Sequence, residues 1–472
     1  MKEIITELTH YGEILLIVTY VIIAALAMRK SGKTERIYSY VLFGGIVLLQ
    51  LLFALNSFIM TLDVRLFTFY GIQLLYVAIV FIVFRIIYKK GSLLLLSHMC
   101  MLLTIGLTII ARVSFAKAIR QLELMIFATI LSCLIPFIMS KFKMLRTMAW
   151  FYGSIGIGLL VLVLLIGENT YGAKLSIEIF DIAFQPSEFV KIVFVFFVAA
   201  MFEHGAGFKQ VVKTSVMAAA HVLILVASKD LGSALIYAIV YVVLVFVATG
   251  NPIYLIFGAV GGAGASYVAY QLFDHVKTRV VAWLDPWSVI ETKGYQVAQS
   301  LFSIGTGGFQ GLGLYKGSPK TVPLVEEDFA FSAIAEELGG IFGICVIIII
   351  FLCVYIMFRA AWESYGHFYK YMALGLGATL GIQVFITIGG AIKLIPSTGV
   401  TLPLISYGGS SVLSTIAMFS IVQGIIILKR DEDDRIEKER LEKSKARKEK
   451  REKAKRAREK QERQKSGKRK GV

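Results

Sequence analysis

The string Glu326-Glu327-Asp328-Phe329 precedes a short apolar stretch, and Glu336 and Glu337 follow about two helical turns later. A carboxylate at the start of such a stretch can accept the first free amides of a helix, which is the structural interpretation of Asp328. It can also act as a general base, because partial burial and repulsion from Glu326 and Glu327 would raise its pKa toward a useful range. Asp328 is therefore the candidate catalytic residue.

Basic and polar side chains that could bind an anionic substrate lie on both sides of this string. Glu188 and Lys191 are three residues apart at the start of an apolar helix, Lys229 precedes the short break Asp230-Leu-Gly232, and Arg279 stands upstream of Asp285-Pro286. As alternatives, the charged pair could be an interfacial anchor, Lys229 part of a turn and Arg279 a headgroup anchor, although ionisable residues inside a helical bundle are functional candidates by default. The predicted substrate-binding residues are Arg279, Lys191, Glu188, Lys229, Gln296, Gln299, Ser300, Glu336, Ser406 and Ser410.

Two further segments have compositions that suit a binding site. Five glycines between Gly305 and Gly313 permit close backbone approach, and the segment lacks the Lys-Ser/Thr of a P-loop. The segment from Ile395 to Ser411 combines two prolines with small hydroxyl residues, a composition that also suits a broken helix with close packing.

The elements that must position these residues are membrane helices. The chain has 472 residues, of which 57% are hydrophobic and 17% charged, whereas soluble domains carry about 25% charged residues. The four cysteines lie within apolar runs and indicate neither a disulfide framework nor a zinc site. Apolar run lengths predict an all-α polytopic membrane protein. Thirteen spans are expected near residues 12–28, 38–58, 69–88, 94–111, 124–140, 147–166, 188–203, 211–228, 232–249, 252–272, 338–358, 370–392 and 404–428.

The distribution of Lys and Arg predicts the orientation and a charged tail. One set of alternate short connections is richer in basic residues, which places that side in the cytoplasm and the N-terminus outside. The large loop 273–337 then lies on the outer face, where long loops are more often functional than connective. Residues 429–472 form a basic cytoplasmic tail, which is either simply solvated or attracted to anionic lipid. No aromatic residue interleaves with its charge, so nucleic-acid binding is not expected.

The order of these motifs resembles the SEDS family (shape, elongation, division and sporulation), which includes RodA, FtsW and SpoVE. The resemblance covers roughly residues 90 to 428. It rests on Gln185-Pro-Ser-Glu188 with Lys191, Asp230-Leu-Gly232, Arg279 with Asp285-Pro286, Gly294-Tyr-Gln296 with Gln299-Ser300, Asp328-Phe329 with Glu336-Glu337-Leu-Gly339, and Thr398-Gly399 through Ser411. It implies three parts: a three-helix extension (1–90), a ten-helix core (91–428) and the tail (429–472).

The resemblance also implies an activity. A SEDS-like protein is expected to be a peptidoglycan glycosyltransferase that polymerises lipid II at the outer face of the bacterial cytoplasmic membrane, for elongation, division or sporulation. Asp328 would deprotonate the acceptor hydroxyl, while Arg279, Lys191 or Lys229, and possible divalent cations such as Mg²⁺ or Mn²⁺, would steady the diphosphate. The expected partner is a class B penicillin-binding protein. The alternatives are a flippase for lipid-linked precursors and a non-catalytic scaffold for a transpeptidase.

Two features depart from the family pattern. The two residues before the key aspartate are usually His-Thr, whereas this chain has Glu326-Glu327, so the local pKa setting is expected to differ. The three N-terminal spans lie outside the common core, and the sequence assigns them no chemistry.

Overall fold

The computed structural model describes residues 2–170, 173–179 and 182–468, and helices dominate them. The N-terminal helices are α1 (Lys2–Ala27), α2 (Gly32–Thr61) and α3 (Val64–Ile87). The remaining long helices are α4 (Leu93–Val113), α5 (Phe115–Ser132), α7 (Ala149–Ile166), α8 (Pro186–Met201), α9 (Phe208–Ala227), α10 (Leu231–Thr249), α11 (Ile253–Leu272), α15 (Gly340–Glu363), α16 (His367–Ala391) and α17 (Gly409–Lys468). Shorter helices are α6 (Ile135–Lys141), α12 (Asp274–Leu284), α13 (Tyr295–Gly307), α14 (Ala330–Glu337), η1 (Lys143–Thr147) and η2 (Pro319–Thr321).

The predicted class, an α-helical polytopic membrane protein, is confirmed, but the count of thirteen spans is not. Among the described residues, twelve helices are long and apolar enough to cross a membrane. The predicted span at 188–203 corresponds to α8, which has only 16 residues because it starts at Pro186 and ends before a turn at Phe202. The predicted span at 124–140 is divided into α5 and α6 near Pro136, a residue that lacks the backbone N–H of a continuous helix.

The sequence did not predict the small antiparallel sheet in the segment before α8. Its strands are β1 (Glu168–Thr170), β2 (Ala173–Ile179) and β3 (Ile182–Phe184), and they pair in the order β1-β2-β3. In the register of β2 with β3, Ile177 lies opposite Phe184. The connection between α7 and α8 is therefore a short sheet rather than a loop.

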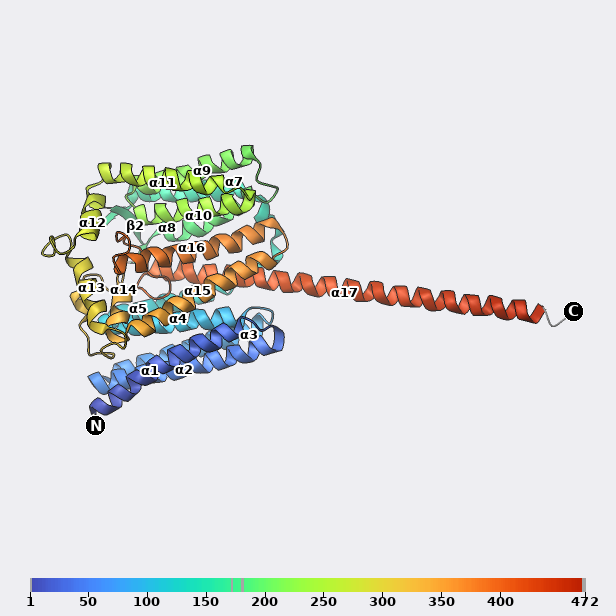
Figure 1. Cartoon of the computed structure of the whole chain (residues 1–472), viewed down its shortest axis with the longest axis horizontal. Helices are drawn as coiled ribbons and strands as arrows, with labels where there is room; N and C mark the ends of the chain where they lie inside the picture. Colours follow the sequence, from blue (N-terminus) through green and yellow to red (C-terminus); the bar gives the residue numbers. More distant parts are fainter. Residues whose placement is uncertain (1, 171–172, 180–181, 469–472) are drawn as a thin grey trace.

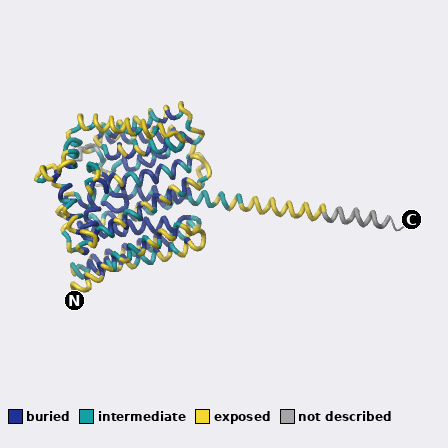
Figure 2. Tube along the Cα trace, in the orientation of Figure 1, coloured by how far each residue is buried: buried dark blue, intermediate teal, exposed yellow. Residues whose placement is uncertain are grey.

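The bundle is built around α4, which is buried along nearly its whole length (Figure 2). The extension α1–α3 lies along one side of the bundle, and α7, α9 and α11 lie on the opposite side (Figure 1). Polar bonds join the extension to the core inside the apolar layer. The Tyr20 hydroxyl bonds to His98 Nδ1 at 2.9 Å, Gln73 Nε2 donates to the Thr104 carbonyl at 3.2 Å, and Tyr76 bonds to Thr129 at 2.7 Å.

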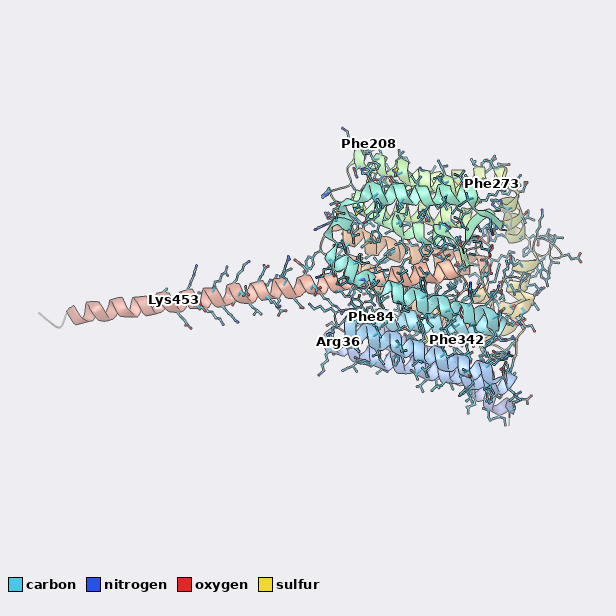
Figure 3. All side chains as sticks on the ribbon, turned by 180° about the vertical axis from the view of Figure 1, so that it is seen from behind. Arg36, Phe84, Phe208, Phe273, Phe342 and Lys453 are labelled. Atoms are coloured by element: carbon cyan, nitrogen blue, oxygen red, sulfur yellow. The ribbon has the colours of Figure 1, made fainter. Side chains whose placement is uncertain are left out.

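The two ends of the bundle differ in structure. The chain N-terminus, the sheet and α12–α14 gather at one end, which also carries Phe273 (Figures 1 and 3). Arg36 and Phe208 lie at the other end, from which α17 continues as a straight helix past Lys453 (Figure 3). The side chains described beyond Arg435 are mostly exposed. The sequence predicted a charged tail, and in the structure its described residues continue the helix α17 to Lys468.

Arg430 anchors α17 where it leaves the bundle. Its Nη1 donates to the main-chain oxygens of Lys90 and Gly91 at 2.9 and 3.0 Å, and its Nη2 lies 3.6 Å from Glu35 of the extension. We expect Arg430→Ala to lower the free energy of unfolding by about 1–3 kcal/mol, because half-buried carbonyls lose a charged donor. Thermal unfolding of the purified chain measures this change. Arg440→Ala, on the exposed tail, is the matched control and should change nothing.

Candidate active site

The acidic turn that carries Asp328 is fixed from two sides. Lys117 of α5 pairs with Glu326 at 2.5 Å and with Glu327 at 3.4 Å. The Tyr407 amide, from the loop before α17, donates to the Glu326 carbonyl at 2.7 Å. The first residue of α14 is Ala330, its N-cap is Phe329, and within the described chain no side-chain bond caps this helix. The interpretation of Asp328 as a helix N-cap is therefore wrong.

Arg279 of α12 and Asp328 meet beside Gly399. A β-carbon placed on Gly399 would lie 3.0 Å from Arg279 Nη2 and 3.5 Å from Asp328 Oδ2, so the two charged groups are neighbours across this glycine. Gly399 has a φ of +71°, which favours glycine. Gly232, at the start of α10, packs just as closely against Thr398 and Val400. Three segments that are distant in sequence thus converge on the acidic turn.

The surroundings of Asp328 suit a general base. The carboxyl is half-buried, and burial raises its pKa to about 6. The nearby charge of Glu327 contributes to this rise in the pKa, whereas Arg279 opposes it. The sequence predicted both the direction and the part played by Glu327. At neutral pH such a carboxyl is mostly ionised yet basic enough to take a proton.

Further basic and unpaired polar groups surround Arg279. Burial lowers the pKa of His275, one turn earlier on α12, and the charges of Arg279 and Lys229 act in the same direction. The Lys229 side chain is exposed. His275 Nε2 and Thr398 Oγ1 are both buried without a hydrogen-bond partner among the described residues. This side of the acidic turn can therefore accept negative charge and supply hydrogen bonds to a ligand.

Glu188 and Lys191 do not belong to this open cluster, and their assignment as substrate-binding residues stays a prediction. Both are more than nine-tenths buried, and their side chains pair at 2.5 Å. Lys191 Nζ also donates to Gln383 Oε1 at 2.9 Å, and Ser414 Oγ donates to Glu188 Oε2 at 3.1 Å. Gln383 Nε2 in turn donates to the Thr401 carbonyl at 3.1 Å. The pair is therefore linked through Gln383 to the loop that carries Gly399.

Four other predicted binding residues also have structural partners. Ser300 is buried between Ser332 and the Ala391 carbonyl, and Glu336 accepts the Ser318 amide at 2.6 Å. Ser406 accepts the Leu402 amide at 2.9 Å, and Ser410 accepts the Gln185 amide at 2.9 Å. These bonds shape the loops around the acidic turn, and the four residues stay predictions as substrate-binding residues.

The remaining two predicted residues lie on α13. Gln296 is half-buried, and its Nε2 donates to the Pro323 carbonyl at 2.8 Å. Gln299 is half-buried one turn later. Both stay predictions as substrate-binding residues. Of the ten predicted substrate-binding residues, the structure brings Arg279 and Lys229 to the cluster around Asp328.

Sequence reasoning missed Lys117, His275 and the structural role of Asp230. Asp230 caps α10 through the Ser233 amide at 3.1 Å and accepts a bond from Ser187 at 2.9 Å. It had been interpreted only as part of a polar break, although Asp before an apolar run is a typical N-cap signal. Lys117 and His275 carried no local signal, because their partners lie on other elements.

The donor set for a divalent cation is limited. Among the described residues, no group of three or more His, Cys, Asp or Glu side chains is placed to hold a metal ion. Asp328 is a carboxylate of the kind that Mg²⁺ and Mn²⁺ prefer. A cation at this site would therefore depend on oxygen atoms from a ligand as well as from the chain.

A substitution at Gly399 tests whether the close approach of Arg279 and Asp328 matters for activity. Gly399→Ala is expected to reduce any activity of the site by about 10–100-fold, because the added methyl would strain the backbone and displace Arg279. Steady-state rates measured alongside thermal unfolding separate this effect from misfolding. Gly305→Ala is the control, since a β-carbon there meets nothing within 4 Å, and it should retain full activity.

The fold and this cluster define a polytopic membrane protein with a carboxylate-centred site in the loops at one end of its bundle. The chain belongs to the FtsW/RodA/SpoVE family of cell cycle proteins, because the family model matches residues 92–430. The extension α1–α3 lies outside this match.

Relatives and solved structures agree with the family assignment. A Mycobacterium tuberculosis protein named peptidoglycan glycosyltransferase RodA is 38% identical over 271 residues, covering 54% of this chain and 58% of that protein's length. A Halorhodospira halophila protein named as a probable peptidoglycan glycosyltransferase FtsW is 35% identical, covering 56% of this chain and 70% of that protein.

Among solved structures, one similar chain comes from a peptidoglycan synthase complex that coordinates polymerization and crosslinking. It is 25% identical, with a TM-score of 0.60, and the match covers 71% of this chain and 97% of that chain. Thermus thermophilus RodA, at 23% identity and a TM-score of 0.52, has a similar fold over 71% of this chain and 96% of that chain.

Proposed function

We propose that this protein is a peptidoglycan glycosyltransferase that polymerises lipid II into glycan strands. The observation that carries the proposal is the half-buried Asp328 carboxyl, whose pKa is raised to about 6, next to Arg279 among the loops at one end of the bundle. The names of the mycobacterial and Halorhodospira relatives support the same reaction.

In this proposal Asp328 is the general base. Its carboxylate removes the proton from the acceptor 4-hydroxyl of one sugar as that oxygen attacks the anomeric carbon of the other. The bond from that carbon to the diphosphate then breaks, and the electron pair leaves with the diphosphate. Lys117 does not take part directly, because it is engaged by Glu326 and Glu327, but it holds the turn in place.

The leaving diphosphate is steadied by Arg279 and Lys229, with His275 and Thr398 as hydrogen-bonding groups beside them. A cationic group that faces the growing charge stabilises the transition state more than the ground state, which is the requirement for catalysis. We further propose that Mg²⁺ or Mn²⁺ would share this task by neutralising part of the diphosphate charge, and that a carboxylate of the acidic turn would help to hold the ion. Titration with a chelator, followed by restoration with each metal, tests that part alone.

We place the site on the outer face of the bacterial cytoplasmic membrane, with the N-terminus outside and the tail in the cytoplasm. The asymmetry of Lys and Arg in the short loops supports this orientation. We propose a class B penicillin-binding protein as partner, supported by the synthase complex among the similar structures. Cysteine labelling from the outside, at an exposed residue of the loop between α12 and α13, tests the orientation, and co-purification tests the partner.

The decisive experiment supplies lipid II to the purified full chain, together with its transpeptidase partner, and separates the products by size. We expect glycan polymer with the wild type and none above background with Asp328→Ala. Polymer formed equally by both proteins would exclude the catalytic assignment. Absence of polymer from a folded wild type in the complete complex would exclude the proposed reaction.

A further inference from the structure

The extension α1–α3 contains a buried polar cluster that the proposed reaction does not use. Glu13 of α1 is completely buried, and His10, one turn earlier, is 7% exposed. His10 Nδ1 lies 3.6 Å from Glu13 Oε2, and Asn56 Nδ2 of α2 donates to Glu13 Oε1 at 3.2 Å. Ionisable groups at such depth in a membrane bundle are costly and are therefore functional candidates.

The cluster reaches out of the extension into the glycine-rich loop. His10 Nε2 lies 2.8 Å from the main-chain oxygen of Gln310, 300 positions later in sequence. A carbonyl oxygen can only accept, so Nε2 must donate the hydrogen bond. The other ring nitrogen, Nδ1, faces the Glu13 side chain. Neither His10 Nδ1 nor Glu13 Oε2 has a hydrogen-bond partner among the described residues, so each is the other's nearest polar neighbour at 3.6 Å, and this contact orients the imidazole.

The main chain at Gln310 is joined directly to the end of α14. The amides of Leu312 and Gly313 donate to the Glu336 and Glu337 carbonyls at 2.9 and 2.8 Å, and the amides of Gly340 and Ile341 donate back to Gly308 and Phe309. A β-carbon on Gly339 would lie 2.3 Å from the carbonyl carbon of Gln310, so the two backbones are in contact. A shift at Gln310 must therefore move the C-terminal end of α14.

The helix α14 connects this contact to the acidic turn. It is a single, entirely buried helix of eight residues that begins two positions after Asp328. The extension is itself bonded to α4 and α5 through Tyr20, Gln73 and Tyr76, so His10 is held by a docked element. A continuous set of packed and hydrogen-bonded groups thus runs from α1 to the base.

We propose that α1–α3 is an intramolecular clamp in which His10, oriented by Glu13, fixes the glycine-rich loop at Gln310 and thereby positions the turn that carries Asp328. His10 and Glu13 are positioning residues and do not touch the substrate. The effect on turnover rests on the proposed function, whereas the effect on the loop does not.

The test compares backbone hydrogen exchange at Leu312 and Gly313 with the kinetics of polymerisation, using the full-length protein in lipid nanodiscs. We expect His10→Phe and Glu13→Leu to accelerate exchange at these amides by about tenfold, because the first removes the bond to Gln310 and the second removes the contact that orients the imidazole. In the same variants kcat should fall about three- to tenfold while KM stays constant, because the base and not the binding surface is displaced.

Conservative variants separate positioning from simple stability. Glu13→Gln can still accept from Asn56 and donate an N–H to His10 Nδ1, and His10→Gln keeps a donor for the Gln310 carbonyl. We expect both to retain exchange rates and kcat close to wild type. Glu7→Gln, on the exposed face of α1, is the matched control and should have no effect.

Two results would overturn the clamp. One is unchanged exchange at Leu312 and Gly313 in folded His10→Phe and Glu13→Leu proteins. The other is a Glu13→Gln protein that behaves like Glu13→Leu. Asp328→Asn distinguishes the clamp from the proposed function, because it should remove activity without altering exchange in the loop. Faster exchange in the clamp variants therefore supports the clamp even if no polymerase activity is found.

Discussion

Asp328→Asn is expected to reduce glycan polymerisation by about 10²–10⁴-fold, because the amide cannot accept a proton from the attacking hydroxyl. The stability of the folded protein should not decrease. Burial raises the pKa of this carboxyl to about 6, so at neutral pH the folded protein holds a charge that it disfavours. The neutral asparagine removes that charge, and the Tm of the variant should equal or exceed that of the wild type. Product analysis on lipid II and thermal unfolding measure the two effects.

The pH profile of the wild type gives a second readout of the same residue. A base with a pKa of about 6 is protonated at lower pH, so kcat/KM should fall about tenfold per pH unit below that value. Glu327→Gln removes a charge that raises this pKa and should move the acid limb to lower pH. Arg279→Gln removes a charge that lowers it and should move the limb to higher pH. If the acid limb of kcat/KM stays at the same pH in both variants, the assignment of Asp328 as the base is contradicted.

Much of the fold could be predicted because membrane spans depend on local composition. All but one of the predicted spans correspond to a single helix, since about 20 apolar residues in sequence suffice to specify one. The shortness of α8 and the break before Pro136 required finer boundaries than run length provides. The sheet was missed although residues 174–179 alternate polar and apolar side chains, a period typical of strands. The signal is short, and the surrounding apolar runs dominated the interpretation.

The site was less accessible to prediction from sequence. Asp328 and Arg279 could be singled out because the first follows two carboxylates at the start of an apolar stretch, and because both belong to motifs that resemble the SEDS family. The partners that decide their setting could not, since Lys117 lies 209 positions from Glu326 and only the fold brings them together. Glu188 and Lys191 were correctly placed on one face, but the sequence could not show that Gln383 and Ser414 bond to them inside the bundle.

This buried pair carries the largest expected effect on stability. Glu188→Leu should lower the free energy of unfolding by about 3–5 kcal/mol, because it leaves the Lys191 ammonium buried without its counter-charge. Lys191→Met should cost a similar amount by leaving the Glu188 carboxylate unpaired. Denaturant titration in detergent, with loss of near-UV signal as the readout, measures both variants. Either variant unfolding at the wild-type denaturant concentration would show that water or another group reaches the pair.

The double variant Glu188→Leu/Lys191→Met decides between pairing and packing. If the single variants are unstable because each leaves one buried charge, removing both charges should recover most of the loss, since apolar side chains of similar volume can replace a buried ion pair at little cost. Losses that simply add would instead assign the effect to packing around Gln383 and Ser414. Activity should remain reduced even when stability returns. Without Lys191, Gln383 loses the donor that holds it under Thr401, and the loop that places Gly399 between Arg279 and Asp328 loses its support.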